Sequence, residues 1–311
     1  MSQIVICEFM DQSVVDETAK NFSTHYDPEL VNTAEELKAF LRTAKALIVR
    51  NRTQVNKDLL ESAPNLKVVG RLGVGLDNID LAECEKRGIK VCPATGANDV
   101  AVAEWVICSI LMLFRNAFFA RTDMLSGKWP RQQCMGKETQ GKTLGLIGYG
   151  GIARETAGRA RALGMHVFAF DPYLPEDSVN WLEVSRCEAL SELLQKSDVI
   201  SLHVPLTDST HHLINVDTIH LMKDGAMVIN AARGSVVDER ALIDGLRSGK
   251  LGGAAFDVFE TEPLTEEAAA LFLQIPNLVL TPHIAGVTVE SNTRVSKKTM
   301  ENVFEVLEKE A

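Results

Sequence analysis

Three short polar segments in the second half of the chain carry residue types that can take part in one reaction. The segments at 230–234, 257–263 and 281–286 contain an arginine, a glutamate and a histidine, namely Arg233, Glu262 and His283. Each segment follows a short apolar run that reads as a β-strand. In an open α/β sheet, ligands bind outside the carboxyl ends of the strands. The spacing therefore predicts one active site built from three strand ends.

The chemistry that these side chains allow is proton transfer beside a bound carboxylate. A histidine suits general acid–base catalysis because imidazoles titrate near neutral pH, so His283 is the candidate acid–base. Glu262 would orient the ring and stabilise its charged form, and Arg233 can hold a substrate carboxylate through two hydrogen bonds. Taken alone, each could be a surface histidine, a turn arginine or a loop acid. Their joint occurrence at three successive strand ends favours the active site.

A glycine-rich loop upstream predicts a dinucleotide site. Residues 144–153 read as a strand that runs into G-x-G-x-x-A, with Gly148 at the tight turn and Gly150 where a pyrophosphate approaches. The next helix would direct its N-terminal N–H groups at the phosphates. A second strand ends at Asp171, which can accept hydrogen bonds from ribose hydroxyls and favours NAD over NADP; the alternative is a turn residue before proline. The predicted contacts from the loop are Gly148, Tyr149, Gly150, Gly151 and Ile152.

The elements that must position these residues are continuous apolar runs separated by amphipathic segments. Continuous runs are typical of parallel strands that are buried on both faces, and the alternation predicts doubly wound α/β units. The predicted strands are 46–49, 68–72, 90–92, 143–147, 167–170, 199–202, 226–229, 254–257 and 278–280. We expect two Rossmann-like domains with a cleft between them. Residues 98–284 would form the NAD-binding domain, and residues 1–97 with 285–311 a flavodoxin-like substrate-binding domain.

Bulk properties narrow the class of protein. The 311 residues carry a net charge of −10 without a basic block, which argues against nucleic acid or an anionic membrane as a partner. The six cysteines form no C-x-x-C pair, and the start of the chain does not resemble a signal peptide, so we expect reduced thiols and a cytoplasmic location. Glu104, Arg115 and Asn116 interrupt the apolar stretch 100–120, which favours a buried helix over a membrane span. No metal-ligand spacing is present.

These motifs resemble the D-isomer-specific 2-hydroxyacid dehydrogenase family. The match includes residues 148–153, 230–234, 257–263 and 282–286, and in the first half residues 49–53 and 70–80. The resemblance implies an Arg233, Glu262 and His283 triad, NAD as cofactor, and a substrate carboxylate held partly by backbone amides at Val74 and Gly75. It also implies a homodimer around the helix near 98–120. The remaining predicted cofactor contacts are His203, Pro205, Thr210, Ala231, Arg233, Asp257, His283 and Gly286.

The resemblance is closest to the 3-phosphoglycerate dehydrogenase-like branch, from which the chain departs at Asn51 and Arg52. Arg50, Asn51 and Arg52 are predicted substrate contacts together with Arg233 and His283, although Arg52 can also be a solvated surface arginine. Trp129, Arg131 and Met135 lie where a dimer partner of the family reaches the active site. The sequence thus predicts an anionic 3-substituted lactate, such as 3-phosphoglycerate or sulfolactate. Glyoxylate or hydroxypyruvate reduction and a non-enzymatic NADH-sensing corepressor are the alternatives; Glu262 argues against formate dehydrogenase, which has glutamine there.

Overall fold

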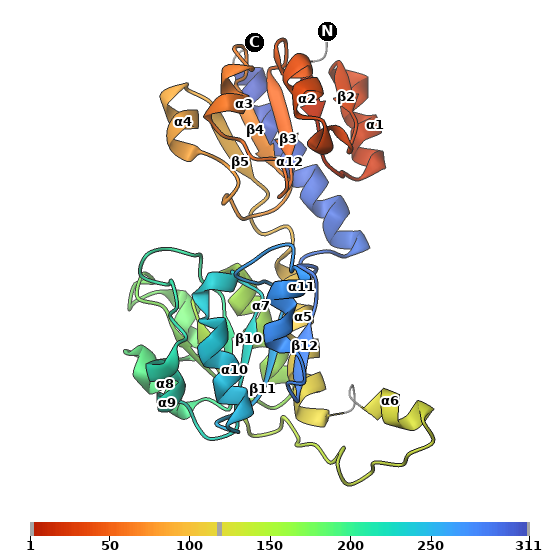
Figure 1. Cartoon of the computed structure of the whole chain (residues 1–311). Helices are drawn as coiled ribbons and strands as arrows, with labels where there is room; N and C mark the ends of the chain where they lie inside the picture. Colours follow the sequence, from red (N-terminus) through yellow and green to blue (C-terminus); the bar gives the residue numbers. More distant parts are fainter. Residues whose placement is uncertain (1–2, 117–119, 310–311) are drawn as a thin grey trace. The chain divides into compact units, whose positions relative to one another are not determined.

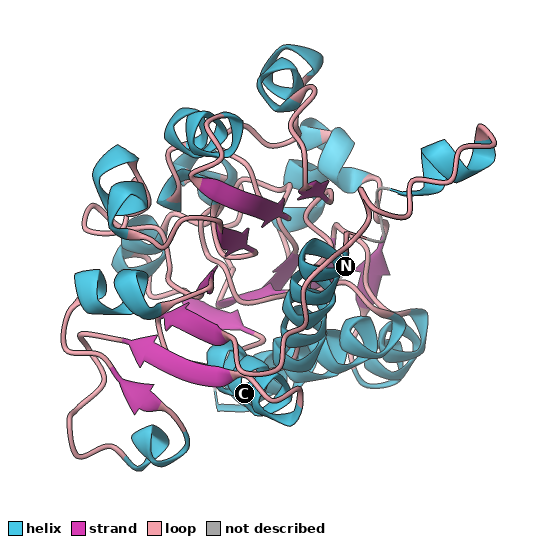
Figure 2. Ribbon diagram, turned by 90° about the horizontal axis from the view of Figure 1, so that it is seen from below, coloured by secondary structure: helices cyan, strands magenta, loops and turns pink. Residues whose placement is uncertain are grey.

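The chain forms two compact units in a computed structural model that describes residues 3–116 and 120–309. The first unit comprises Met1–Asn98 and Val287–Ala311, and the second comprises Asp99–Gly286. Strands and helices alternate along both of them (Figures 1 and 2). The second unit is therefore an insertion in the sequence of the first.

The first unit is built on a five-stranded parallel sheet in the order β2-β1-β3-β4-β5. This order, with β1 inside the sheet, is that of flavodoxin-like folds. The strands are β1 (Ile4–Ile6), β2 (Thr24–Tyr26), β3 (Ala46–Val49), β4 (Val68–Arg71) and β5 (Lys90–Pro93). The register pairs Ile4 with both Thr24 and Ala46, so β1 lies between β2 and β3.

Helices cover both faces of this first sheet. One face packs against α2 (Ala34–Leu41), α3 (Lys57–Glu61) and α4 (Leu81–Lys86), and the other against α1 (Gln12–Asn21) and α12 (Val289–Lys309). Alternate strand residues point to opposite faces, as the pleat requires. Val5 and Leu47 belong to the first core, and Ile4 and Ile48 to the second. The continuous apolar pattern of these strands follows from burial on both sides.

The second unit contains a seven-stranded parallel sheet in the order β12-β11-β10-β9-β6-β7-β8. Its strands are β6 (Thr143–Ile147), β7 (His166–Phe170), β8 (Ser185–Arg186), β9 (Val199–Leu202), β10 (Ala226–Asn230), β11 (Leu251–Phe256) and β12 (Leu278–Leu280). The strand order reverses between β6 and β9. In a doubly wound sheet, this switch point is where a dinucleotide binds.

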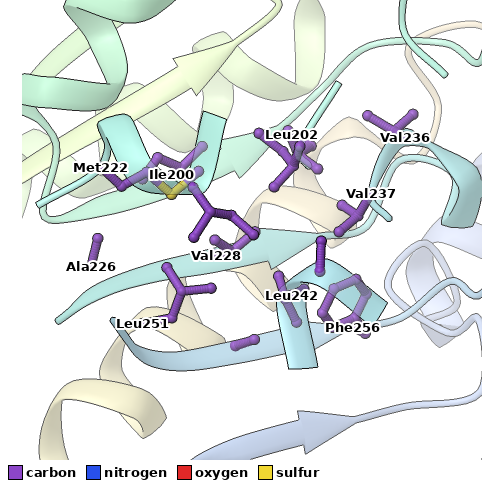
Figure 3. Packing of buried hydrophobic residues seen from close by; sticks show 14 of the residues in the cluster. Ile200, Leu202, Met222, Ala226, Val228, Val236, Val237, Leu242, Leu251 and Phe256 are labelled. Carbon is purple, nitrogen blue, oxygen red and sulfur yellow. The ribbon is translucent and has the colours of Figure 1, made fainter. Parts of the chain in front are cut away.

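Two hydrophobic cores sandwich the second sheet. One lies under α8 (Leu190–Lys196), α9 (Val216–Leu221) and α10 (Glu239–Arg247), where Val228 and Phe256 pack against Leu242 (Figure 3). The other lies under α5 (Asp99–Arg115) and α7 (Gly151–Ala162), and includes Leu146 and Ile229. Short helices α6 (Ala120–Leu125) and α11 (Glu266–Ala269) complete the α-helices described in this unit.

The predicted α/β fold with two parallel sheets is confirmed. Three strands were not predicted: β1, a run of only three apolar residues, and the edge strands β2 and β8, which are short and contain polar residues. The long helix predicted near 98–120 is α5, which ends at Arg115, and Asn116 has a left-handed φ of 50°. The part of that prediction that falls on residues 117–119 lies outside the described residues.

No helix within 3–116 or 120–309 combines the length and the apolar character needed to cross a membrane. In the same ranges, no three histidine, cysteine or acidic side chains are grouped as a metal ion would require.

Candidate active site

Neighbouring strands bring the three predicted polar segments of the second unit together. β10, β11 and β12 are adjacent and parallel, and the register pairs Asn230 with Phe256 and Phe256 with Leu280 (Figure 1). Their carboxyl ends therefore lie at the same level of the sheet. The segments 230–234, 257–263 and 281–286 leave the sheet side by side.

The turn that carries Arg233 is fixed by a buried asparagine. Asn230 is fully buried at the end of β10, where its Nδ2 donates to the carbonyl of Arg233 at 2.8 Å and its Oδ1 accepts from the N–H of Ala232 at 3.0 Å. The Nη1 of Arg233 donates to the carbonyl of Ala232 at 2.5 Å. Ala231 is partly buried in the same turn. The guanidinium group thus projects from a backbone that Asn230 holds on both sides.

Gly234 allows the turn after β10 to lie directly against the segment after β11. A Cβ atom at Gly234 would collide with the carbonyl group of Phe259 and the backbone nitrogen of Glu260. These are main-chain atoms, which cannot rotate away as a side chain can. Only glycine fits between the segment of Arg233 and the segment of Glu262.

His283 and Glu262 form a hydrogen-bonded pair. His283 Nδ1 lies 2.6 Å from Glu262 Oε2, while Glu262 Oε1 accepts from the N–H of Phe259 at 2.9 Å. Burial disfavours the charged carboxyl, but the bonds from His283 and Phe259 and the charges of His283 and Arg233 outweigh it, so the pKa of Glu262 is lowered. The His283 side chain is 43% exposed and that of Glu262 33%. His283 Nδ1 is therefore committed to Glu262, and no hydrogen bond from the described residues reaches its other ring nitrogen, Nε2.

A buried carboxylate holds the loop that carries His283. Asp257 is 1% exposed; its Oδ1 accepts from Thr281 Oγ1 at 2.5 Å and from the N–H of Ile284 at 2.8 Å, and its Oδ2 accepts from the N–H of Ala285 at 2.7 Å. The N–H of His283 also donates to the carbonyl of Asp257 at 2.8 Å. His283 adopts a left-handed φ of 54°, which non-glycine residues rarely do without support. These bonds stabilise that backbone conformation.

Burial and hydrogen bonding act in opposite directions on this carboxyl. Burial raises the pKa of Asp257, while the bonds from Thr281, Ala285 and Ile284 and the charge of His283 lower it; burial prevails. Asp257 was predicted to contact the cofactor. In the structure both of its carboxylate oxygens bind protein donors in the His283 loop.

The glycine-rich loop lies at the switch point between β6 and β9. Gly148 follows β6 with a φ of 85°, and its N–H donates to the carbonyl of Phe170 at 2.9 Å. A Cβ atom on Gly148 would press on the carbonyl of His203. Gly150 is the N-cap of α7, and no heavy atom lies within 4 Å of the position that its Cβ would occupy. Gly151 and Ile152 begin α7, so open space meets a helix N-terminus, as a pyrophosphate requires.

Asp171 links the end of β7 to the glycine loop. Its Oδ2 accepts from the N–H of Tyr149 at 2.9 Å and its Oδ1 from the N–H of Tyr173 at 2.9 Å. A carboxylate has about four lone-pair directions, so acceptor capacity remains on both oxygens. The geometry fits an adenosine ribose beside Gly150, and a negative charge here disfavours an added phosphate.

The segment after β9 also borders the glycine loop. The N–H of His203 donates to the carbonyl of Ile147 at 2.8 Å, and its Nε2 lies 2.9 Å from Ser201 Oγ. Burial lowers the pKa of His203 to about 4, which keeps this imidazole neutral near pH 7. Thr210 Oγ1 donates to the carbonyl of Pro205 at 2.7 Å and closes a turn. The predicted contact Gly286 is the last residue of the second unit.

The predicted substrate contacts Arg50, Asn51, Arg52, Val74 and Gly75 belong to the first unit. Val74 and Gly75 follow β4, and no acceptor within the described part of the chain binds their backbone N–H groups. Asn51 and Arg52 are exposed in the loop after β3, whereas Arg50 is partly buried. All five lie in loops at the carboxyl ends of strands in the first sheet.

The fold and the site together define a dinucleotide-dependent oxidoreductase. A glycine loop at a switch point, an acidic residue at the next strand end, and a histidine–glutamate pair beside an arginine are the parts that hydride chemistry at a C–OH group needs. The NAD-binding domain of D-isomer specific 2-hydroxyacid dehydrogenases matches residues 107–285. The chain belongs to this family. It is an oxidoreductase that acts on the CH–OH group of 2-hydroxy acids, with NAD as its cofactor.

Individual relatives extend the match over both units. The (S)-sulfolactate dehydrogenase of Chromohalobacter salexigens is 51% identical over 307 residues, 99% of each chain. The hydroxypyruvate reductase of Thermotoga maritima is 43% identical over 273 residues, 88% of each chain. The D-lactate dehydrogenase of Aquifex aeolicus, solved with NAD and lactic acid, has a TM-score of 0.84 at 31% identity and covers 98% of this chain and 96% of its own. D-3-phosphoglycerate dehydrogenases are further relatives.

Sequence reasoning did not find the residues that hold the site in place. Asn230 and Gly234 lie in the segment 230–234 that matches the family, but no separate role was predicted for them. The function of Asp257 in the His283 loop was missed. An asparagine directly after an apolar strand run is the sequence signal for such a fixed turn. No signal in the sequence pairs Gly234 with the backbone of Phe259, because that contact joins two separate strand ends.

Proposed function

We propose that this enzyme oxidises a D-configured 2-hydroxy acid that carries a second anionic group on C3, and that (S)-sulfolactate is this substrate. The observation that carries the proposal is the 51% identity to an (S)-sulfolactate dehydrogenase over 99% of both chains. The exposed guanidinium of Arg52, which is a residue type suited to a sulfonate or phosphate, supports it. Sulfolactate and 3-phosphoglycerate share the requirement for such a cation.

The configuration of (S)-sulfolactate agrees with a family named for D-isomers. In lactate the carboxylate outranks the methyl group, whereas in sulfolactate the sulfur-bearing C3 outranks the carboxylate. The same spatial arrangement at C2 is therefore labelled R in D-lactate and S in sulfolactate. One binding mode for the carboxylate, hydroxyl and hydrogen at C2 would serve both compounds.

The triad would act on the C2 hydroxyl of the substrate. NAD, when bound, accepts the hydride from C2. His283 would take the hydroxyl proton at Nε2, because Nδ1 is engaged with Glu262. Glu262 would stabilise the imidazolium that results, and Arg233 would hold the substrate carboxylate through paired hydrogen bonds.

The cofactor would be held by residues of the second unit. The N–H groups at Gly150, Gly151 and Ile152 would meet the pyrophosphate, and Asp171 would accept from the adenosine ribose. Further contacts that we propose are Gly148, Tyr149, His203, Pro205, Thr210, Ala231, Arg233, Asp257, His283 and Gly286. For Asp257 the contact would use acceptor capacity beyond the three protein donors that it already binds.

The first unit would supply the remaining contacts to the substrate. We propose that the N–H groups of Val74 and Gly75 bind the carboxylate, and that the loop of Arg50, Asn51 and Arg52 binds the C3 substituent. On this basis residues 1–98 and 287–311 form a substrate-binding domain, and residues 99–286 the NAD-binding domain.

The proposal is tested by steady-state kinetics with (S)-sulfolactate, D-3-phosphoglycerate and D-glycerate, each with NAD and with NADP. We expect kcat/KM to be highest for (S)-sulfolactate with NAD, by about tenfold or more over D-glycerate, because only a substrate with a charged group on C3 gains charge-assisted hydrogen bonds from Arg52. A higher kcat/KM for D-glycerate would overturn the substrate assignment and favour a hydroxypyruvate reductase, the activity named for the Thermotoga maritima relative.

We also propose that the protein functions as a homodimer in the cytoplasm. α6 and the chain that follows it project from the rest of the second unit (Figure 1). Leu125, Trp129 and Met135 on this segment are 75%, 77% and 80% exposed, and large exposed apolar side chains mark interaction surfaces. The cysteines are all free thiols, which supports a reducing compartment. Analytical ultracentrifugation of Trp129→Asp against the unmodified protein tests the assembly; a dimer of unchanged stability would place the interface elsewhere.

A further inference from the structure

The loop after β3 is organised around the buried carboxylate of Glu8. Glu8 follows β1 and is 3% exposed. Its Oε1 accepts from the N–H groups of Arg50 at 2.9 Å and Thr53 at 3.0 Å, and its Oε2 accepts from the N–H of Arg52 at 3.2 Å. Three backbone donors of one short loop therefore converge on a single side chain.

The same loop is held from its carbonyl side by an asparagine. Asn78 Nδ2 donates to the carbonyls of Thr53 at 2.7 Å and Arg50 at 3.3 Å. Thr53 is buried, and its Oγ1 lies 3.4 Å from the Sγ of Cys7, the residue before Glu8. The N–H groups of Arg50, Arg52 and Thr53 and the carbonyls of Arg50 and Thr53 are thus bound by side chains from outside the loop, which restrains its backbone.

The side chains of the two arginines in this loop lie in different environments. Arg50 is committed within the first unit, since its Nη2 donates to Asn292 Oδ1 at 2.9 Å and its guanidinium lies 5.8 Å from the ring centroid of Phe9. Arg52 is exposed, and Asn32 Oδ1 accepts from its Nη2 at 2.5 Å. A guanidinium carries five N–H donors, so Arg52 retains donors for an anion.

We propose that Glu8 is a positioning residue for substrate specificity: its carboxylate fixes the loop 50–53 so that Arg52 binds the second anionic group of the substrate. This inference rests on the proposed function, because it needs a substrate with a charged group on C3. Glu8 itself contacts neither the substrate nor the reacting atoms. Because Glu8 already restrains the loop, Arg52 loses less backbone freedom when it binds the anion.

The experiment compares Glu8→Gln, Arg52→Ala and the double variant in the full-length enzyme with NAD. Two substrates are used: (S)-sulfolactate, with two negative charges, and D-glycerate, with one. Glutamine keeps the size of Glu8 but replaces one acceptor oxygen by an N–H donor that faces a backbone N–H. Asp80→Ala is the matched control, because Asp80 caps α4 in the same unit by accepting from the N–H of Glu83 and makes no hydrogen bond to residues 50–53.

Glu8→Gln should raise KM for (S)-sulfolactate about tenfold and leave kcat within about twofold. The contact with the second anionic group is made in the bound substrate and in the transition state, so the substitution weakens both equally. KM for D-glycerate should change less than about twofold. Adding Glu8→Gln to Arg52→Ala should cause no further loss with (S)-sulfolactate, because residues in one network are not additive. Asp80→Ala should lower the melting temperature and affect KM for the two substrates equally.

The outcomes distinguish this inference from the proposed function. An Arg52→Ala enzyme that treats both substrates alike would remove Arg52 as an anion contact, and the role of Glu8 with it. A charge-selective loss in Arg52→Ala that Glu8→Gln does not share would overturn the role of Glu8 alone. An equal loss on both substrates in Glu8→Gln would reduce Glu8 to a stabilising residue. If Glu8→Gln does not fold, Asn78→Ala replaces it, because it loosens the same loop from the carbonyl side and should give the same selective rise in KM.

Discussion

Asp257 in the second unit and Glu8 in the first each fix the backbone of a neighbouring loop through hydrogen bonds to a buried carboxylate. Each is a buried carboxylate that follows a strand and accepts three hydrogen bonds from the loop after a neighbouring strand: Asp257 follows β11 and binds the loop after β12, and Glu8 follows β1 and binds the loop after β3. The loops differ in what they carry. One presents His283, and the other presents Arg52.

Because the two loops carry different groups, substitutions that loosen them should reduce activity in two different ways. Loosening a loop that carries an acid–base group should lower kcat for every substrate. Loosening a loop that reads the far end of the substrate should raise KM for some substrates only.

Replacing the acid–base group itself should have the largest effect. His283→Asn removes the proton acceptor, so kcat should fall by about 10²–10⁴-fold with (S)-sulfolactate and D-glycerate alike. Steady-state rates give kcat, and NADH fluorescence titration serves as the control, in which the Kd for NADH should change far less than kcat, because His283 is only one of the many proposed cofactor contacts. A loss below tenfold would remove His283 from its assigned role.

Asp257→Asn should come next, because it substitutes a donor for one of the acceptors that fix the His283 loop. A misplacement of about 1 Å in a catalytic group can cost on the order of 10²-fold, so we expect a fall in kcat of that size. The loss should be equal for (S)-sulfolactate and D-glycerate, unlike the loss predicted for Glu8→Gln. A rise in KM for only one of the two substrates would end the distinction between the two carboxylates.

Gly234→Ala should destabilise the catalytic loops by steric overlap alone. The added Cβ meets the main chain of Phe259 and Glu260, and overpacking of this kind costs about 1–3 kcal/mol in the free energy of unfolding. Urea denaturation measures the change. Gly158→Ala is the control, since Gly158 lies inside α7 with no heavy atom within 4 Å of the new Cβ, and should be neutral or stabilising. Equal stability of the two variants would mean that the 230–234 and 257–263 segments can move apart freely.

Glu262→Gln should give the smallest change, seen in pH profiles. It removes the negative charge beside the imidazole, so the alkaline limb of the rate profile for 2-oxo acid reduction should move to lower pH. An unchanged pH profile would show that the negative charge of Glu262 does not stabilise the charged form of His283 in the reaction.

The lowered pKa of Glu262 also predicts how stability depends on pH. A carboxyl whose pKa is lower in the folded state stabilises the fold above the pKa of an unfolded glutamate, about 4.3, and this contribution is lost as pH falls through the folded value. Unfolding free energies measured between about pH 6 and pH 3 should therefore fall less steeply for Glu262→Gln than for the unmodified enzyme.

The sequence predicted the parts of this molecule whose signals are local. Nine apolar runs marked strands, and G-x-G-x-x-A with Asp171 marked the switch point, because a turn that needs Gly148 leaves its trace in consecutive residues. β2 and β8 were missed, since a short strand of mixed polarity at a sheet edge takes its structure from the neighbouring strand. The hydrogen bonds of Glu8 were missed for the same reason. They can be recognised only when β1 is known to lie beside β3.

The insertion of the second unit into the first has a consequence for the order in which the chain folds. α12 comes from the last residues, yet its Val295, Met300 and Val303 complete the core against β1, β3 and β4. During synthesis the first 98 residues emerge long before this helix, with one face of their sheet only partly covered. The 188 residues of Asp99–Gly286 form a continuous unit that can fold earlier. A chain that ends at Gly286 should therefore protect the second unit from protease while the first remains sensitive.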